Sequence, residues 1–170
     1  MFEAIDGLGL AFIEQPLGWN DVLDHADLAR KISTPICLDE SARDLAMVEQ
    51  AIRIGACQYV NIKPGRVGGL TVALAIHDLC RDAGIPCWVG GMLESATGAA
   101  HCVALAMLDN FVYPADIFPS ARFYEQDLAD PPLVLVHDES GTPSVEALDE
   151  LPEPNPERLI RLTVEHAVVE

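Results

Sequence analysis

Lysine is nearly absent from this sequence of 170 residues, in which only Lys31 and Lys63 occur. Lysine and arginine together number 10 against 27 acidic residues, so the formal net charge is -17 at pH 7. Such a chain repels phosphate backbones, and we therefore expect no nucleic-acid partner. Its apolar runs are too short to cross a bilayer as a helix, and its first residues lack the basic charge of a signal peptide. The sequence therefore predicts no membrane association.

The five cysteines never show the Cys-x-x-Cys spacing that is typical of zinc and redox sites. Their number is odd and their neighbours are apolar, which favours buried, reduced thiols in a cytoplasmic protein. Half of the residues are hydrophobic, and the mean hydropathy is +0.21. This composition excludes a disordered or fibrous chain and predicts one packed core.

Short apolar runs alternate with stretches of helical periodicity along most of the chain. The apolar runs lie at 11–14, 36–39, 59–63 and 86–89, with a weaker one at 111–116. The helical stretches lie at 21–31, 45–54, 70–80 and 96–108. This alternation indicates parallel βαβ units, and the repeat suits a (β/α) barrel, which has eight units in about 250 residues. The sequence predicts four to five such units, hence part of a barrel, with an open doubly wound sheet as the alternative.

Charged residues end three consecutive apolar runs. Glu14 and Asp39 are 25 residues apart, and Lys63 follows Asp39 by 24. Functional side chains of parallel βα folds gather at the carboxyl ends of the strands. Two carboxylates there would repel each other without a cation, and hard oxygen ligands suit Mg²⁺. A lysine beside a dication is favoured in its neutral form, which accepts a proton. Taken singly, Asp39 is also typical of a helix cap and Lys63 of a solvated loop.

Four motifs in register resemble a known family. They occupy 12–17 (Phe-Ile-Glu-Gln-Pro-Leu), 35–41, 61–69 and 88–95. Together they resemble the muconate-lactonizing subgroup of the enolase superfamily, with the nearest likeness to the o-succinylbenzoate synthase / N-acylamino acid racemase family. The resemblance covers about residues 8 to 130. It implies an α/β fold in which residues 1–136 form the last four to five βα units of an enolase-type barrel. The acidic residues and prolines of 137–170 predict an irregular carboxyl-terminal tail there.

The resemblance also implies roles for single residues. Glu14 and Asp39 look like carboxylate ligands of Mg²⁺, for which Mn²⁺ is an alternative. Lys63 looks like the acid/base lysine on a barrel strand. Gly91 and Met92 are similar to the loop that lines the substrate pocket.

The activity implied is that of an Mg²⁺-dependent o-succinylbenzoate synthase, a dehydratase of menaquinone biosynthesis that acts on a small-molecule carboxylate through an ene-diolate. The alternative within the family is N-acylamino acid racemase. The family's Lys-x-Lys motif and first metal-binding aspartate have no counterpart in this sequence. We therefore expect an inactive fragment that needs the amino-terminal half of the barrel and forms a homo-oligomer. A non-catalytic remnant, or one half of a split protein, is the alternative of another class.

Overall fold

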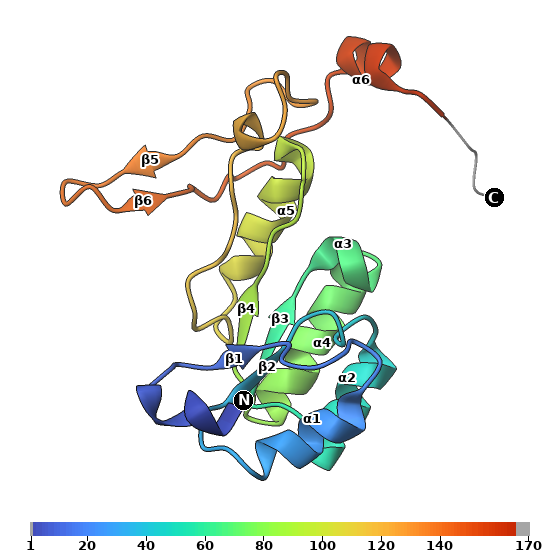
Figure 1. The fold of residues 1–170 in the computed structure, drawn as a ribbon. Helices are drawn as coiled ribbons and strands as arrows, with labels where there is room; N and C mark the ends of the chain where they lie inside the picture. The colour runs from blue at the N-terminus through green and yellow to red at the C-terminus, as the bar shows by residue number, and fades with distance from the viewer. Residues whose placement is uncertain (1, 166–170) are drawn as a thin grey trace. The chain divides into compact units, whose positions relative to one another are not determined.

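The computed structural model describes residues 2–165 and shows two compact units (Figure 1). The first unit comprises Met1–Gly90 and Leu105–Asp116, and the second comprises Gly91–Ala104 and Ile117–Glu170. In the part of the chain that the structure describes, no helix is both long enough and apolar enough to cross a membrane.

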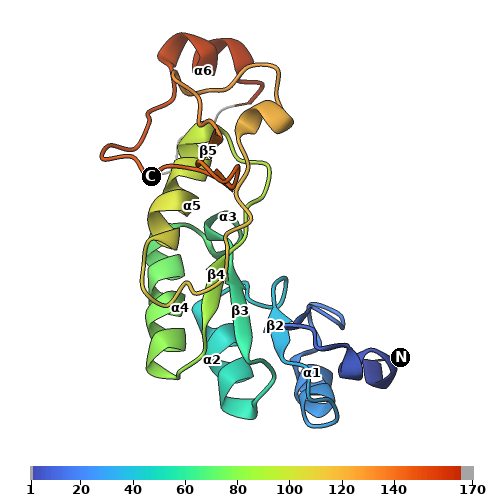
Figure 2. The same cartoon turned by 90° about the vertical axis from the view of Figure 1, so that its left-hand side faces the viewer.

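A parallel sheet of four strands forms the centre of the first unit. The strands lie in the order β1-β2-β3-β4, and each pairs with the next in sequence. Their bounds are β1 (Ile13–Glu14), β2 (Ile36–Leu38), β3 (Tyr59–Ile62) and β4 (Cys87–Val89). Figure 2 shows β2, β3 and β4 side by side in this order. The predicted βαβ alternation is therefore confirmed for these four strands.

Helices connect the strands and lie along one side of the sheet (Figure 1). They are α1 (Val22–Ala29), α2 (Leu45–Ile54) and α4 (Leu70–Asp82). The ends of α2 show why the helices begin and stop where they do. The side chain of Asp44 accepts a hydrogen bond from the backbone N–H of Met47 at 2.8 Å, which caps the helix. Gly55 ends it with a φ of 71°, a conformation that glycine adopts without strain.

The core of the first unit lies between the sheet and these helices. Alternate strand residues point to the same face, and those facing the helices are apolar and at most 1 % exposed: Ile36, Leu38, Val60, Ile62 and Val89. Burial of such side chains contributes about 1.5–3 kcal/mol each. This packed face fixes the register of the strands, and so fixes which residues reach the strand ends.

The opposite face of the sheet carries four aromatic rings, which we call the aromatic floor: Phe12, Tyr59, Trp88 and Tyr113. The ring centroid of Phe12 lies 5.1 Å from that of Tyr59, 6.1 Å from that of Trp88 and 5.0 Å from that of Tyr113. The indole N–H of Trp88 donates to Cys37 Sγ at 3.2 Å. Cys37 is buried, like the other four cysteines, and burial raises the pKa of its thiol.

Two segments of the first unit differ from the sequence-based expectation. The run at 111–116 forms no strand, and only two isolated parallel bridges, Cys87 with Phe111 and Gly90 with Asp116, pair it with the β4 segment. Pro114 lies between these bridges and has no N–H with which to form a continuous ladder. A short helix, α3 (Pro64–Val67), was not expected after β3. Proline suits the first turn of a helix, and Gly68 ends the turn with a φ of 94°.

The second unit contains α5 (Ala96–Ala106), whose last two residues belong to the first unit, and the antiparallel pair β5 (Val136–His137) and β6 (Pro143–Ser144). The tail expected to be irregular is partly ordered, since it also forms α6 (Pro156–Leu162). The side chain of Asn155 caps α6 by accepting from the N–H of Arg158 at 3.1 Å, which explains this correction. The domain boundary expected between 136 and 137 stays a prediction.

A buried aspartate holds the second unit together. Asp127 accepts from the backbone N–H of Ala96 at 2.8 Å, at the start of α5, and from that of Ala129 at 2.7 Å. The guanidinium of Arg158 donates to the carbonyl of Ala129 at 2.8 Å and to Asp130 at 2.7 Å. These bonds tie α6 to the loop before it.

Asp6 fastens the amino-terminal turns, η1 (Phe2–Ala4) and η2 (Asp6–Leu8), to the segment before β2. Its carboxylate accepts from the N–H groups of Ser33 and Thr34 at 2.9 and 2.7 Å and from the Thr34 hydroxyl at 2.7 Å. These bonds lower the pKa of Asp6 to about 2. The stabilising effect should therefore be complete above about pH 4, the ordinary pKa of aspartate, and fade as the pH falls towards 2.

We expect Asp6→Asn to lower the urea midpoint of unfolding at pH 6, and this loss to shrink as the pH approaches 2. Urea titrations of both proteins at pH 6, 4 and 2.5 measure the difference. Asp24→Asn is the control, because Asp24 is an exposed acid of α1 with no such cluster of donors. A difference that stays constant across these pH values would contradict the role given to Asp6.

Candidate active site

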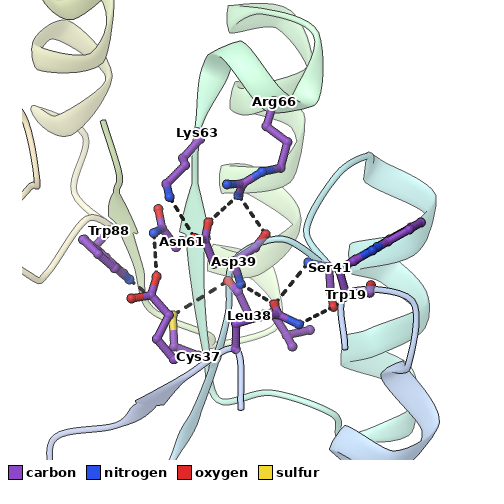
Figure 3. Close-up of polar contacts among 11 residues, drawn as sticks. Trp19, Cys37, Leu38, Asp39, Ser41, Asn61, Lys63, Arg66 and Trp88 are labelled. Carbon is purple, nitrogen blue, oxygen red and sulfur yellow. Dashed lines mark hydrogen bonds and ion pairs between the residues drawn. The ribbon is translucent and has the colours of Figure 1, made fainter. Parts of the chain in front are cut away.

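Three charged side chains reach the same edge of the sheet, at the carboxyl ends of β1, β2 and β3. The ammonium of Lys63 donates to Asp39 Oδ2 at 2.8 Å (Figure 3). The Lys63 and Asp39 side chains are 15 % and 7 % exposed, so this ion pair is largely shielded from water. Glu14 and Asp39 line one open hollow of about 530 Å³, together with Glu40 and Trp19. The structure thus brings together the three residues that the sequence singled out.

Glu14 is held by a side chain of β3, which is separated from β1 by β2. The side-chain amide of Asn61 donates to Glu14 Oε1 at 2.7 Å. Partial burial raises the pKa of Glu14, and the negative charge of Asp39 raises it further, whereas the bond from Asn61 opposes the rise. The two carboxylates therefore repel each other at this edge, and a cation between them would remove the repulsion.

Asp39 has a second cationic partner that sequence reasoning missed. The Arg66 guanidinium, from α3, pairs with Asp39 Oδ1 and donates to the Asp39 carbonyl at 2.9 Å (Figure 3). Each oxygen of the Asp39 carboxylate therefore faces one positive charge, Lys63 on one side and Arg66 on the other. Such charge-assisted bonds are short and directional, and they fix the orientation of this carboxylate.

Gly90, directly after β4, makes room for the two side chains that approach from β3. A Cβ at this position would lie 2.3 Å from Asn61 Oδ1 and 2.4 Å from Lys63 Cε. Asn61 is 1 % exposed, and its Oδ1 has no hydrogen-bond partner. The site therefore contains a buried acceptor oxygen beside the Lys63 side chain, and only glycine at position 90 leaves the space for both.

The donor set fits a hard divalent cation. Mg²⁺ is commonly bound by one or two carboxylates, with water and substrate oxygens completing an octahedron. Glu14 and Asp39 supply two such carboxylates at one hollow. Within residues 2–165 no group of three or more His, Cys, Asp or Glu side chains is placed to hold a metal. These residues thus offer two carboxylates, and the rest of a coordination shell has to come from elsewhere.

Gly91 and Met92, the residues expected to line a substrate pocket, belong to the second unit. The side chain of Met92 is largely exposed, at 48 %, and its backbone N–H donates to the Glu94 carboxylate at 2.6 Å. Glu14, Asp39 and Lys63 belong to the first unit. The role of Gly91 and Met92 in binding substrate therefore stays a prediction.

Known proteins are similar to this chain over most of its length. The sequence model of the family described as "Enolase C-terminal domain-like" matches residues 1–144. An N-succinylamino acid racemase from Amycolatopsis sp is 54% identical over 127 residues, which are 75% of this chain and 34% of that protein. An o-succinylbenzoate synthase from Geobacillus kaustophilus is 48% identical over 129 residues, 76% of this chain and 34% of that protein. The chain thus spans about a third of the length of these curated relatives.

Solved structures show the same fold. A member of the enolase superfamily from Listeria innocua superposes with a TM-score of 0.79 at 40% identity, covering 92% of this chain and 42% of that one. A dipeptide epimerase from Cytophaga hutchinsonii, complexed with Mg and the dipeptide D-Ala-L-Val, superposes with a TM-score of 0.79 at 25% identity, covering 95% of this chain and 44% of that one.

Proposed function

Because the chain belongs to the enolase C-terminal domain-like family of the enolase superfamily, we propose that it supplies the carboxyl-terminal part of a Mg²⁺-dependent site that acts on a carboxylate substrate. The reaction proposed is the dehydration carried out by o-succinylbenzoate synthases. The observation that carries the proposal is the ion pair of Lys63 with Asp39, at the edge where Asp39 and Glu14 line one hollow.

Each residue has a distinct task in this proposal. Glu14 and Asp39 hold the cation, and the cation, when bound, supplies positive charge that offsets the negative charge developing on the substrate carboxylate. Lys63 lies beside them with its ammonium on the same edge. An amine in this place is able to take a proton from the carbon next to the carboxylate, or to stabilise the resulting anion by its charge. Asn61 holds Glu14, and Gly90 keeps the path of Lys63 open.

Racemisation of an N-succinylamino acid is the second candidate reaction. The Amycolatopsis relative with that name is 54% identical to this chain, against 48% for the Geobacillus kaustophilus synthase. Both reactions begin at a proton next to a carboxylate, so the same three residues serve either one. The choice between them belongs to parts of the whole protein beyond these three side chains.

A fusion protein tests the proposal. The amino-terminal portion of the Geobacillus kaustophilus synthase, up to the start of the matched region, is joined to this chain, and the product is assayed with Mg²⁺. We expect turnover of 2-succinyl-6-hydroxy-2,4-cyclohexadiene-1-carboxylate, and racemisation of an N-succinylamino acid is measured in parallel. The control fusion carries Asp39→Asn. A folded fusion, shown by a cooperative melt, that turns over neither substrate would contradict the proposal and favour a non-catalytic role.

The chain by itself is expected to be inactive in the same assays, because the family's Lys-x-Lys motif and first metal-binding aspartate have no counterpart in it. We propose that an amino-terminal half of the barrel, supplied in cis or in trans, is its partner, and that the assembled protein is a homo-oligomer. Turnover by the isolated chain at the rate of the fusion would show that the amino-terminal portion is dispensable.

A further inference from the structure

Gln15 stands between the two carboxylates of the candidate site in an unusual backbone conformation. It follows Glu14 directly, and its N–H donates to the Cys37 carbonyl at 2.8 Å, the last main-chain bond between the ends of β1 and β2. Its φ is 39°, the only positive value among the non-glycine residues that the structure describes. Such a conformation is unfavourable for a residue with a side chain and persists only where the surroundings hold it.

Beyond this point the side chain of Gln15, instead of the β1 backbone, binds the backbone of the segment that follows β2. Its Oε1 accepts from the N–H of Asp39 at 3.0 Å and from the N–H of Ser41 at 3.1 Å. Its Nε2 donates to Ser41 Oγ at 2.8 Å and to the Leu17 carbonyl at 3.2 Å. The amide thus takes the place of a main-chain partner for the segment that carries Asp39.

A buried histidine fixes which way the Gln15 amide points. His25 is 0 % exposed, and its Nδ1 lies 2.6 Å from the Asp21 carbonyl, which only accepts. Nδ1 therefore carries the proton, and Nε2 is an acceptor. This nitrogen accepts from the N–H of Leu17 at 3.3 Å and lies 3.4 Å from Gln15 Nε2. The NH₂ end of Gln15 is consequently directed to His25 and Ser41, and its oxygen to Asp39.

From these contacts we propose that Gln15 is a positioning residue, which sets the place of Asp39 relative to Glu14 so that both carboxylates reach one cation. The proposal rests on the metal-binding role given to this pair above. A ligand pair has to be held within about 0.5 Å of its productive geometry by the groups behind it. Gln15 links the two ligands directly, because its backbone is bonded to Glu14 and its side chain accepts from the backbone N–H of Asp39.

The chain offers a control for this test in Gln58, a second glutamine whose side chain binds the backbone of the β2 segment. Gln58 Oε1 accepts from the N–H of Ile36 at 2.9 Å, at the opposite end of β2. Gln58→Met removes a side-chain bond to the backbone at the start of β2, whereas Gln15→Met removes those to the N–H groups of Asp39 and Ser41 just after its end. Only Gln15→Met touches the candidate site. Both variants keep the side-chain length, and thermal melts compare their stability.

Mn²⁺ is the probe, added to the fusion protein described above and followed through the residue-specific broadening of amide signals in NMR spectra. We expect broadening in the wild type to centre on Glu14 and Asp39 and to disappear in Asp39→Asn. Gln15→Met should weaken this binding about 10- to 100-fold, as is usual when a group behind a metal ligand is removed, whereas Gln58→Met should leave it unchanged. Hydrogen exchange of the Asp39 and Ser41 amides should accelerate in Gln15→Met, and that of Ile36 in Gln58→Met.

The outcomes separate the two proposals. If Mn²⁺ broadening in the wild type does not centre on Glu14 and Asp39, the metal-binding role is wrong, and the inference about Gln15 fails with it. If the wild type binds there but both methionine variants weaken binding equally, Gln15 acts only through stability, and the inference is overturned while the proposed function stands.

Discussion

Replacing Lys63 with methionine in the fusion protein is expected to slow the exchange of the substrate α-proton by about 10²–10⁴-fold, the usual contribution of a positioned acid/base group. The loss follows from the place of the Lys63 ammonium, 2.8 Å from Asp39 at the edge that carries both carboxylates. Proton exchange is measured by ¹H NMR in D₂O with an N-succinylamino acid. The control is Lys31→Met, which removes the chain's other lysine at an exposed position.

A second substitution separates proton transfer from charge. Lys63→Arg keeps a positive side chain beside Asp39, but a guanidinium stays protonated and accepts no proton. We expect this variant to fold like the wild type and to lose proton exchange as fully as Lys63→Met. Retained exchange in Lys63→Arg would show that the residue acts by its charge alone, and unchanged exchange in Lys63→Met would exclude Lys63 from the reaction.

Gly90→Ala is expected to cost about 1–3 kcal/mol of the free energy of unfolding, the range found when a packed site receives an extra methyl group. The new Cβ would lie 2.3 Å from Asn61 Oδ1 and 2.4 Å from Lys63 Cε, so both side chains have to move. Urea unfolding of the isolated chain measures the cost. In the fusion protein the same change should reduce turnover, because the displaced Lys63 no longer meets Asp39.

The matched control is Gly7→Ala, because a Cβ at Gly7 meets no atom within 4 Å and its backbone needs no positive φ. We expect this variant to unfold at the urea concentration of the wild type. Equal midpoints for Gly7→Ala and Gly90→Ala would mean that the β3 side chains relax around the methyl group without cost, and that the space over Gly90 is not required.

The sequence predicted the family and the place of the charged residues for a simple physical reason. Parallel strands that repeat every 24 or 25 residues bring their carboxyl ends to one edge, so Glu14, Asp39 and Lys63 had to gather there. The resemblance to the enolase superfamily is confirmed by the family match and by the relatives, and the parallel sheet is part of its (β/α) barrel. The roles of the three residues stay predictions.

Other parts of the site depend on features that spacing does not reveal. Asn61 was within reach, because it precedes Lys63 by two residues on one strand and so shares its face. The contact of Arg66 with Asp39 required the unexpected turn of α3. The bonds of Gln15 depend on a positive φ and on a side chain that reaches a neighbouring strand. No residue pattern along a single strand specifies either of these.

The aromatic floor has a consequence for the dielectric environment of the charges above it. Four rings and the Cys37 thiol occupy the inner face of the sheet next to the strand ends, and Trp88 is only 9 % exposed. Water therefore reaches the Lys63–Asp39 pair from the open side of the hollow. The side formed by the aromatic floor has a low dielectric constant. Charges interact more strongly across a medium of low dielectric constant than across water. The floor thus strengthens the interactions among the charges at this edge, and salt weakens them less than it weakens fully exposed ion pairs.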